Sequence, residues 1–420
     1  MTRTLILVAV FLTATIARAD RIAPNAGGPG FPGIPGRPGY APNGITVAPP
    51  HPAQAAVVEL LEDDAAWLAR QLNRTSTPEE LDGLGRAGAW GEDCYSGGAC
   101  LKVAGYQRFT EHVSGWEYPV VEKPRPGEYR FIRFAWMKPA TATPPAPGGV
   151  MVQLCISGID WLRYHAGTNL VGFSPALQVS AAAPAEWEVV TRDLYADYGR
   201  PHTLTGFAFT AMNGVALFDH MYLGRTIEDL DKVTNAAKIG LRKERFTAAE
   251  LTAHFKNLTS EDAAVRNPSL WAMGRDAAGS VNYLKANYAL PDPSDLLTQI
   301  QKAIADLDSP RYAVREAAAK RLDEWGGTAI AYLNDAKRKP GASPELIERA
   351  GKLIEKHKLN EAPLSDPATR LPLAVLHVLE QAETAEARDL LERVGKARNN
   401  PATGFETTAA LERLAKRVKK

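Results

Sequence analysis

Glu128-Tyr-Arg-Phe-Ile-Arg-Phe-Ala-Trp136 is the clearest β-strand in this chain of 420 residues. Aromatic and β-branched residues dominate it, and such residues favour strands. Arg130 and Arg133 interrupt the apolar run, as expected for a strand with one face in water. Pro126-Gly127 precedes the run and signals a turn. The stretch therefore predicts a strand over residues 128–137.

Similar short apolar runs with turn signals between them surround this strand. They predict further strands over 100–104, 116–122, 149–155, 160–165, 176–180, 186–193, 203–210 and 215–223. Asn213-Gly214, between the last two, is a strong signal for a two-residue hairpin. Nine short strands without intervening helices predict an antiparallel β-sandwich over residues 85–231.

After about residue 226 the apolar residues recur at helical spacing. Ser309-Pro310 and Ser343-Pro344 mark helix starts. Further amphipathic segments cover about 368–382, 385–395 and 405–418. Short helices joined by tight turns are typical of helical arrays. We expect connecting helices over 232–292 and an α-helical array over 293–420, so that the fold class is β followed by α.

The N-terminus has the pattern of a secretory signal peptide over residues 1–19. Arg3 precedes an apolar run from Leu5 to Ile16, and Ala17-Arg18-Ala19 provides a small-residue cleavage site. The run is shorter than the roughly 20 residues that a spanning helix needs. The pattern predicts export, with a secreted, periplasmic or cell-envelope location and no membrane span after cleavage. An uncleaved anchor is the alternative.

Two segments connect this leader to the predicted strands. Residues 20–52 contain Gly and Pro in collagen-like triplets, which are too few for a triple helix and predict an extended linker. Residues 53–84 are expected to be a helical lead-in. Val57, Leu60, Leu61, Ala65, Leu68 and Leu72 lie three or four positions apart, and Thr77-Pro78 has the form of a second helix start.

Aromatic residues in the predicted strands provide a candidate ligand face. Trp116 and Tyr118 share one face of their strand, while Trp161 and Arg163 share a face of another and Tyr164 points to the opposite face. Aromatic rings present apolar faces to sugar rings, and arginine donates hydrogen bonds to hydroxyls. These five residues are therefore candidates for binding a glycan or cell-envelope material. Ordinary packing of strand residues is the alternative.

The cysteines and the balance of charged residues restrict which disulfides and which partners the sequence supports. Cys94 and Cys100 flank five residues with two glycines, so they are candidates for a small disulfide loop in an oxidising compartment; two free thiols are the alternative. Lys and Arg number 49 against 48 Asp and Glu, which argues against a nucleic-acid partner. The basic Lys416-Arg417 end is explained by a solvated helix terminus.

Catalytic motifs do not stand out in the sequence. It contains no Gly-x-Ser-x-Gly elbow, no phosphate loop and no His-x-x-x-His pair. Four acidic residues, Glu186, Glu188, Asp193 and Asp197, are the candidates for a carboxylate pair of the kind that glycoside hydrolysis needs. We expect a non-catalytic protein without a cofactor, with a polysaccharide hydrolase as one alternative.

Two stretches resemble modules of secreted bacterial proteins of the planctomycete type. Ile304-Ala-Asp-Leu-Asp-Ser-Pro-Arg-Tyr-Ala-Val-Arg-Glu-Ala-Ala-Ala-Lys-Arg-Leu322 and the segment from Ala382 to Leu391 resemble a HEAT-like helical module. The resemblance implies a protein-binding scaffold over 293–420. Segments 126–136, 187–193 and 217–231 resemble a sandwich module that is similar in outline to jelly rolls and galactose-binding-like domains.

The second resemblance also implies a metal. Leu217-Phe218-Asp219 is similar to the end strand of galactose-binding-like modules, where the acid supports a structural calcium, so Asp219 is the candidate ligand. A hard cation needs several oxygen ligands, and only this one is identified. Together these patterns predict an exported binding or scaffold protein that docks a protein partner. A purely structural assembly component is the other alternative.

Overall fold

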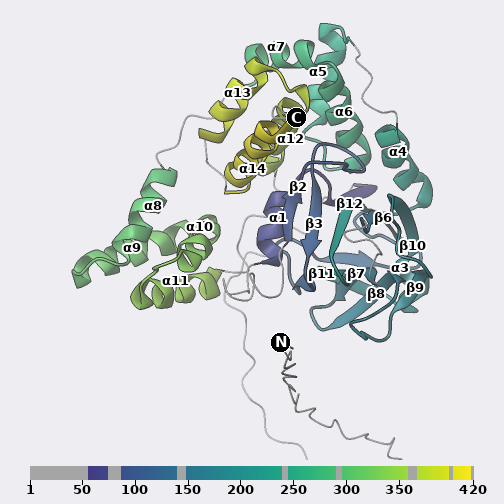
Figure 1. Ribbon diagram of the computed structural model, residues 1–420. Coiled ribbons are helices and arrows are strands. Elements are labelled where there is room, and N and C mark those ends of the chain that lie inside the picture. The colour runs from purple at the N-terminus through teal and green to yellow at the C-terminus, as the bar shows by residue number, and fades with distance from the viewer. Residues whose placement is uncertain are drawn as a thin grey trace, which may run out of the picture. The chain divides into compact units, whose positions relative to one another are not determined.

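The computed structural model describes residues 55–73, 87–139, 148–238, 245–289, 296–357, 367–396 and 401–417. The predicted signal peptide, the predicted linker and the predicted helix start at Thr77-Pro78 lie outside these ranges. The described residues fall within one compact unit, Ala48–Lys420. Strands occupy mostly its N-terminal half and helices its C-terminal half (Figure 1), which confirms the predicted order of β followed by α.

The first sheet has six strands. Its order is β10 (Glu188–Asp193), β6 (Phe131–Met137), β12 (Val215–Gly224), β3 (Cys100–Ala104) and β2 (Ala87–Trp90), while β1 (Val57–Leu61) also pairs with β12. All these pairs are antiparallel. Strand β3 pairs with the first half of β12 and β1 with its second half. Two segments therefore share one edge of β12.

The second sheet also has six strands. Its order is β4 (Gln107–Thr110), β11 (His202–Ala211), β7 (Gly149–Ile156), β8 (Asp160–Gly167) and β9 (Leu177–Ser180), while β5 (Tyr118–Val120) also pairs with β11. Strands β8 and β9 run parallel, so the sheet is mixed and not purely antiparallel as predicted. Each of the nine predicted strands overlaps an observed one, and the Asn213-Gly214 turn joins β11 to β12.

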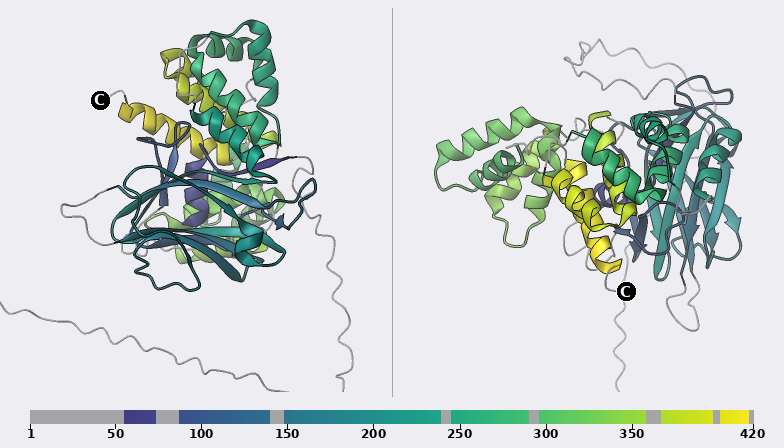
Figure 2. Two further views of the ribbon diagram at one scale, coloured as in Figure 1. Left: turned by 90° about the vertical axis from the view of Figure 1, so that its right-hand side faces the viewer. Right: turned by 90° about the horizontal axis from the view of Figure 1, so that it is seen from above.

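One hydrophobic core takes side chains from both sheets. The ring centroids of Phe209 on β11 and Phe218 on β12 lie 4.6 Å apart. Those of Phe134 on β6 and Tyr164 on β8 lie 6.2 Å apart. Figure 2 shows the two sheets as two layers. Aromatic pairs across this interface account for the large apolar residues that made the strands recognisable in sequence.

The predicted helical lead-in over 53–84 is wrong in its first part. Val57–Leu61 is a strand, and α1 begins only at Ala65 and ends at Leu72. Four of the five strand residues are buried, because β1 has a core on each face. A strand of this kind is a continuous apolar run, which periodicity alone does not distinguish from a buried helix.

The helices of the C-terminal half form two groups with separate cores. They are α4 (Ile227–Lys238), α5 (Ala248–Asn257), α6 (Ala263–Arg275), α7 (Ala277–Asn287), α8 (Leu296–Asp306), α9 (Tyr312–Trp325), α10 (Gly327–Arg338), α11 (Pro344–His357), α12 (Pro367–Ala382), α13 (Ala385–Lys396) and α14 (Pro401–Arg417); a short α3 (Leu194–Tyr198) follows β10. Helices α4–α7 and α12–α14 share one core, while α8–α11 have another. The predicted array over 293–420 is therefore divided between two cores.

The first group of helices packs on the first sheet. Val57 of β1 and Tyr222 of β12 belong to the same core as α4, α6 and α12. The first sheet thus has the second sheet on one face and helices on the other. The segment from β1 to α1 lies at this junction, and the candidate site is built around it.

Candidate functional site

Two of the five predicted ligand-binding residues lie together on β8. The Trp161 ring meets Phe109 edge-on, with centroids 6.2 Å apart. Arg163 Nε donates to Gln153 Oε1 at 3.0 Å, and its guanidinium lies over the Phe173 ring. Both side chains are partly exposed. They bind neighbouring residues and do not line the pocket described below.

The other three predicted residues lie elsewhere. Tyr164 is fully buried in the core, where its hydroxyl donates to Asp197 Oδ2 at 2.9 Å. Trp116 and Tyr118, with ring centroids 5.7 Å apart, both line a pocket. The five residues therefore do not form one surface, because β8 and the segment before β5 are separate parts of the second sheet.

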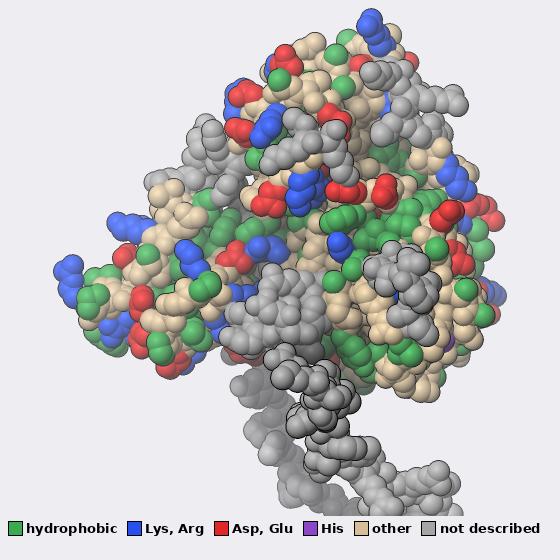
Figure 3. All heavy atoms as spheres, viewed as in Figure 1, with side chains coloured by type: hydrophobic (Ala, Val, Ile, Leu, Met, Phe, Trp, Pro, Cys, Tyr) green, Lys and Arg blue, Asp and Glu red, His purple; other side chains and the backbone are tan. Residues whose placement is uncertain are grey.

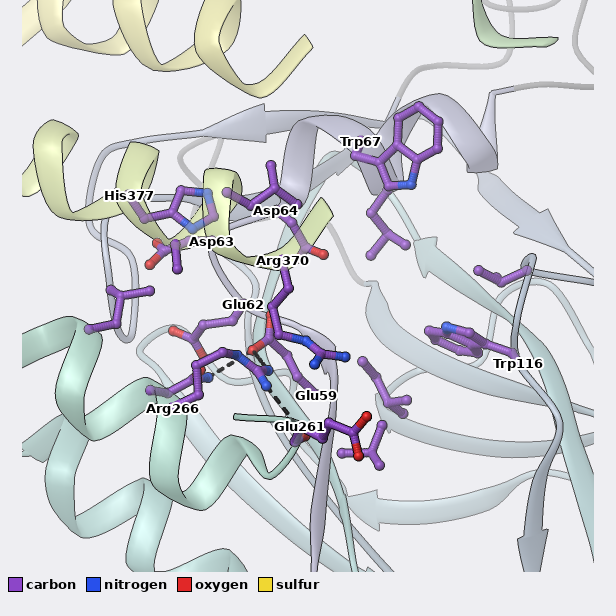
Figure 4. Close-up of a pocket in the computed structure, with 18 of the residues that line it drawn as sticks. Glu59, Glu62, Asp63, Asp64, Trp67, Trp116, Glu261, Arg266, Arg370 and His377 are labelled. Atoms are coloured by element: carbon purple, nitrogen blue, oxygen red, sulfur yellow. Dashed lines mark hydrogen bonds and ion pairs between the residues drawn. The ribbon is translucent and has the colours of Figure 1, made fainter. Parts of the chain in front are cut away.

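The pocket lies where the β1–α1 segment meets α6 and α12. Its polar lining is Glu59, Glu62, Asp63 and Asp64 from the β1–α1 segment, Gln71 of α1, Ser114 before β5, Glu261, Arg266 and Asn267 at α6, and Arg370 and His377 of α12. Its aromatic lining is Trp67, Trp116, Tyr118 and Trp271. Figure 4 shows Arg266 entering from α6 and Arg370 from α12, with Trp116 on the opposite wall. The volume of about 90 Å³ holds several water molecules or one small polar ligand.

An ion pair joins two walls of the pocket. Glu59 Oε2 accepts from Arg266 Nη2 and from Asn267 Nδ2, each at 2.8 Å. Arg266 Nη1 donates to the Ser260 carbonyl oxygen at 2.8 Å. The hydrogen bonds of Arg266 are thus used within the protein, and they hold α6 against β1.

Four polar atoms of the lining residues have no hydrogen-bond partner within the described parts of the chain. They are Asp63 Oδ2, Asp64 Oδ1, Trp271 Nε1 and His377 Nε2. These residues are only 3%, 8%, 5% and 6% exposed. A buried polar group without a partner costs roughly 1–3 kcal/mol. The pocket is also lined by charged and polar side chains from the β1–α1 segment, α6 and α12, so it suits a polar occupant.

Burial determines the protonation of these groups. Burial and the neighbouring Glu62 charge raise the pKa of Asp63 well above its ordinary value. Burial and the charges of Glu59 and Glu406 do the same to the pKa of Asp64. Burial, assisted by the Arg413 charge, lowers the pKa of His377 to about 3. The imidazole is therefore neutral at physiological pH.

A glycine loop holds Asp63 in position. Asp63 Oδ1 accepts from the backbone amides of Gly98 and Ala99, at 2.5 and 3.0 Å. Gly97 has a φ of 60°, and a Cβ atom there would lie 2.2 Å from Asp63 Oδ1. The loop can approach this carboxylate only because it has no side chain at that position.

Asp219 accepts hydrogen bonds from the same loop. Its Oδ2 accepts from the amides of Tyr95 and Ser96 at 2.9 and 3.1 Å, and its Oδ1 from the His220 amide at 2.7 Å. Within the residues that the structure describes, no group of three or more His, Cys, Asp or Glu side chains is arranged to hold a metal ion. The calcium-binding role of Asp219 therefore stays a prediction, on a carboxylate whose two oxygens already accept from backbone amides.

His220 is buried beside Asp219 because β12 has a bulge there. Its φ is 52°, and the pairing register with β6 shifts between Asp219 and Tyr222. His220 Nδ1 lies 3.1 Å from Ser96 Oγ and 3.3 Å from Glu62 Oε2. Of these groups only Glu62 lines the pocket. Ser96, His220 and Glu62 are buried together and hydrogen-bonded to one another beside the bulge.

Cys94 and Cys100 are the pair for which the sequence left a disulfide and two free thiols open. Cys94 and Cys100 are free thiols. Cys94 Sγ lies 3.4 Å from the Trp90 carbonyl oxygen, to which it donates. The pKa of the Cys94 thiol is raised mainly by a hydrogen bond with Cys100 and also by burial. The two thiols are neighbours, but each is protonated and poorly nucleophilic.

Sequence reasoning missed most of the pocket. Glu62, Asp63 and Asp64 follow the apolar run of β1 directly, while Arg370 and His377 belong to the distant helix α12. Three consecutive acids at the end of a buried run were the one signal available. The four acids considered earlier do not line the pocket: Glu188 accepts from Trp136 Nε1, while Asp193 and Asp197 pair with Arg130 and Arg192.

The surface carries both signs of charge. Figure 3 shows Lys and Arg side chains interspersed with Asp and Glu on the face in view. Among the described helices, none combines the length and the apolar character needed to span a bilayer. No protein-family model matches this chain, and no curated protein matches it by sequence.

Proposed function

We propose that this chain is an exported, non-catalytic binding and scaffold protein whose ligand site is the pocket between β1, α1, α6 and α12. The ligand is a carbohydrate of small size or the end of a glycan. In this proposal the two sheets act as a sandwich of the jelly-roll type. Helices α8–α11 act as a HEAT-like array that docks a protein partner.

The unpartnered polar atoms beside aromatic rings are the observation that carries the proposal. Two carboxylate oxygens, an indole N–H and an imidazole nitrogen lack partners among the described residues. Each hydroxyl of a sugar both donates and accepts hydrogen bonds, so a sugar offers partners of both kinds to the polar side chains of the lining. Trp116 and Tyr118 offer apolar ring faces at the same pocket.

Binding of sugars to the full chain, measured by calorimetry and on a glycan array, tests the proposal. Trp271→Phe keeps an aromatic ring but removes the unpartnered N–H together with part of the buried indole, so we expect weaker binding and some loss of stability. Trp116→Ala should abolish binding. Trp161→Ala, on β8 outside the pocket, is the matched control and should bind like the unaltered chain.

The outcomes separate the alternatives. Loss of binding in Trp161→Ala but not in Trp271→Phe or Trp116→Ala would move the site to β8 and contradict the proposal. Failure of the unaltered chain to retain any glycan would favour a purely structural assembly component. Thermal unfolding of each variant distinguishes loss of the site from loss of the fold.

A polysaccharide hydrolase is the second candidate, and the buried carboxyl groups of Asp63 and Asp64 favour it. Glycoside hydrolysis uses one carboxylic acid with a raised pKa and one carboxylate. Burial raises the pKa of both Asp63 and Asp64, and Glu59 is an ion-paired carboxylate in the same pocket. Release of reducing ends, lost in Asp64→Asn, would establish this activity in place of simple binding.

A further inference from the structure

The thiols of Cys94 and Cys100 lie next to each other at one end of the β2–β3 pair. Cys100 is the first residue of β3, and its partner across the sheet is Trp90, the last residue of β2. The chain turns after Trp90 and brings Cys94 Sγ to 3.4 Å from the Trp90 carbonyl oxygen. The two thiols also form a hydrogen bond with each other. Two thiols in contact have the starting geometry for a disulfide within one chain.

The segment between the two cysteines, residues 94–100, is called here the cysteine loop, and it holds two buried carboxylates. Four of its backbone amides donate to Asp63 of the β1–α1 segment and to Asp219 of β12, which are both more than nine-tenths buried. These are the amides of Tyr95, Ser96, Gly98 and Ala99. A buried carboxylate that loses its donors is costly, so the fold depends on the conformation of this loop.

Two more elements contact the cysteine loop and the residue before it. Arg417 of α14 donates from Nη2 to the Gly98 carbonyl oxygen at 2.9 Å. Trp187, which precedes β10, donates from Nε1 to the Asp93 carbonyl oxygen at 2.5 Å. Residues 94–99 are bends or irregular backbone between β2 and β3. Individual contacts therefore hold the loop in the reduced chain, and a covalent bond at its base would add a further constraint.

We propose that Cys94 and Cys100 are a redox site, at which a reversible disulfide closes the base of the cysteine loop and fixes the amides that hold the buried carboxylates. The structure describes the reduced pair. A disulfide stabilises a fold mainly by restricting the unfolded chain, and here it also joins the two ends of an irregular segment. The inference does not rest on the proposed sugar binding, since neither cysteine lines the pocket.

The oxidant in this reaction is a low-molecular-weight disulfide, RSSR. Cys94 is the first nucleophile, because it is partly exposed whereas Cys100 is fully buried. Its thiolate attacks one sulfur of RSSR, the external S–S bond breaks, and the released thiolate takes up the proton that Cys94 lost. The Cys100 thiolate then attacks Cys94 Sγ and releases the second RSH in the same way. Two cysteine thiols are oxidised and one external disulfide is reduced to two thiols.

Oxidised glutathione, added to the reduced full chain at pH 8.5, tests the inference. This pH is chosen because only a thiolate attacks a disulfide, and the hydrogen bond with Cys100 and burial raise the pKa of Cys94. We expect the thiols titrated after denaturation to fall from three to one, with no glutathione attached to the chain. The Tm of the oxidised chain should rise by about 2–5 °C, and dithiothreitol should reverse both changes.

Variants assign the reaction to this pair. Cys155→Ser removes a buried thiol on β7 and should leave the oxidation and the rise in Tm intact. Cys94→Ser should keep its two remaining thiols and show no rise in Tm. Glutathione that stays attached to Cys94 would show that Cys100 cannot reach it and would overturn the inference, as would three thiols left in the unaltered chain. A bond that forms without a change in Tm would overturn the stabilising role of the disulfide, and none of these measurements on the unaltered chain depends on a variant folding.

Discussion

The backbone amide of Trp67 donates a hydrogen bond of 2.6 Å to a carboxylate oxygen of Glu406, 339 positions further along the chain. Trp67 belongs to the first turn of α1, and the preceding Asp64 makes no side-chain cap. Amides in a first turn have no acceptor within their own helix. Glu406 of α14 therefore caps α1 from outside, and the C-terminal helix stabilises one wall of the pocket.

The buried cap predicts an unusual dependence of stability on pH. Burial raises the pKa of Glu406 from 4.5 to about 7. Between these values the folded chain holds a proton that the unfolded chain has released, so the free energy of unfolding falls as the pH rises through this window. Above pH 7 the loss from this group is on the order of 3 kcal/mol.

Glu406→Gln tests the predicted titration of Glu406. Glutamine cannot ionise, but its amide oxygen can still accept from the Trp67 backbone amide. We expect little change below pH 4.5 and a higher free energy of unfolding at pH 8, measured by urea denaturation. Glu412→Gln, an exposed residue on the same helix, is the control and should show neither effect. A Glu406→Gln variant less stable than the unaltered chain at pH 8 would contradict the predicted titration.

A buried ion pair holds α14 to α12. Arg413 Nε and Nη2 donate to the two oxygens of Glu380, at 2.8 and 2.7 Å, and both side chains are almost fully buried. Arg413→Met removes the bidentate partner of the buried Glu380 charge and leaves only Arg417 Nη2, 3.4 Å from Glu380 Oε1. Breaking a buried pair costs roughly 3–5 kcal/mol. We expect a loss of that size in urea denaturation.

Arg388→Met is the matched control for this pair. Arg388 lies 3.7 Å from Glu392 on the surface of α13, where both side chains are about half exposed. Exposed pairs contribute roughly 0–1 kcal/mol, so this change should be nearly neutral. Equal losses in the two variants would show that the burial of Arg413 does not determine its contribution.

The loop that holds Asp63 should not tolerate a side chain at Gly97. Gly97→Ala introduces a Cβ atom against the Asp63 carboxylate and strains a residue with a φ of 60°. Such changes destabilise by more than about 1 kcal/mol, and displacement of Asp63 should also weaken ligand binding.

Gly88→Ala supplies the comparison, because no atom lies within 4 Å of the Cβ position there and its φ is not positive. Denaturation and sugar titration of both variants measure the two effects. If a folded Gly97→Ala chain bound sugar as tightly as the unaltered chain, Asp63 would not be part of the ligand site.

The free thiols make a chemical prediction. Cys94, Cys100 and Cys155 should all react with a thiol reagent when the chain is denatured without reductant. In the folded chain the reaction should be slow at neutral pH, because the hydrogen bond with Cys100 raises the pKa of Cys94 and Cys100 is buried. A single reactive thiol in the denatured chain would instead establish a Cys94–Cys100 bond.

The strands could be read from sequence because each carries its own signal. The run from Phe131 to Met137 is rich in aromatic residues and follows the Pro126-Gly127 turn, and Asn213-Gly214 specifies a hairpin. By contrast, Val57–Leu61 gave a false helical periodicity, since a core on each face leaves no polar alternation to detect. The segment is a strand because it pairs with an edge of β12, and that pairing cannot be seen in the local sequence.

The candidate site could not be read in the same way. Trp116 and Tyr118 were identified as aromatic residues on one face, and both line the pocket. Asp63 and Asp64 had no partner in sequence to suggest a role. Arg370 and His377 lie more than 300 positions from them, and no periodicity predicts that α12 packs against the β1–α1 segment.

By itself, the sequence determined the local elements: where side chains alternate, where they recur each helical turn, and where glycine, proline and asparagine end an element. These are properties of neighbouring residues. Only the tertiary structure decided which carboxylates lose water and which keep an unpaired oxygen. Desolvation and hydrogen-bond satisfaction depend on groups brought together from β1, α6, α12 and α14, and contacts at such separation are a property of the packed chain.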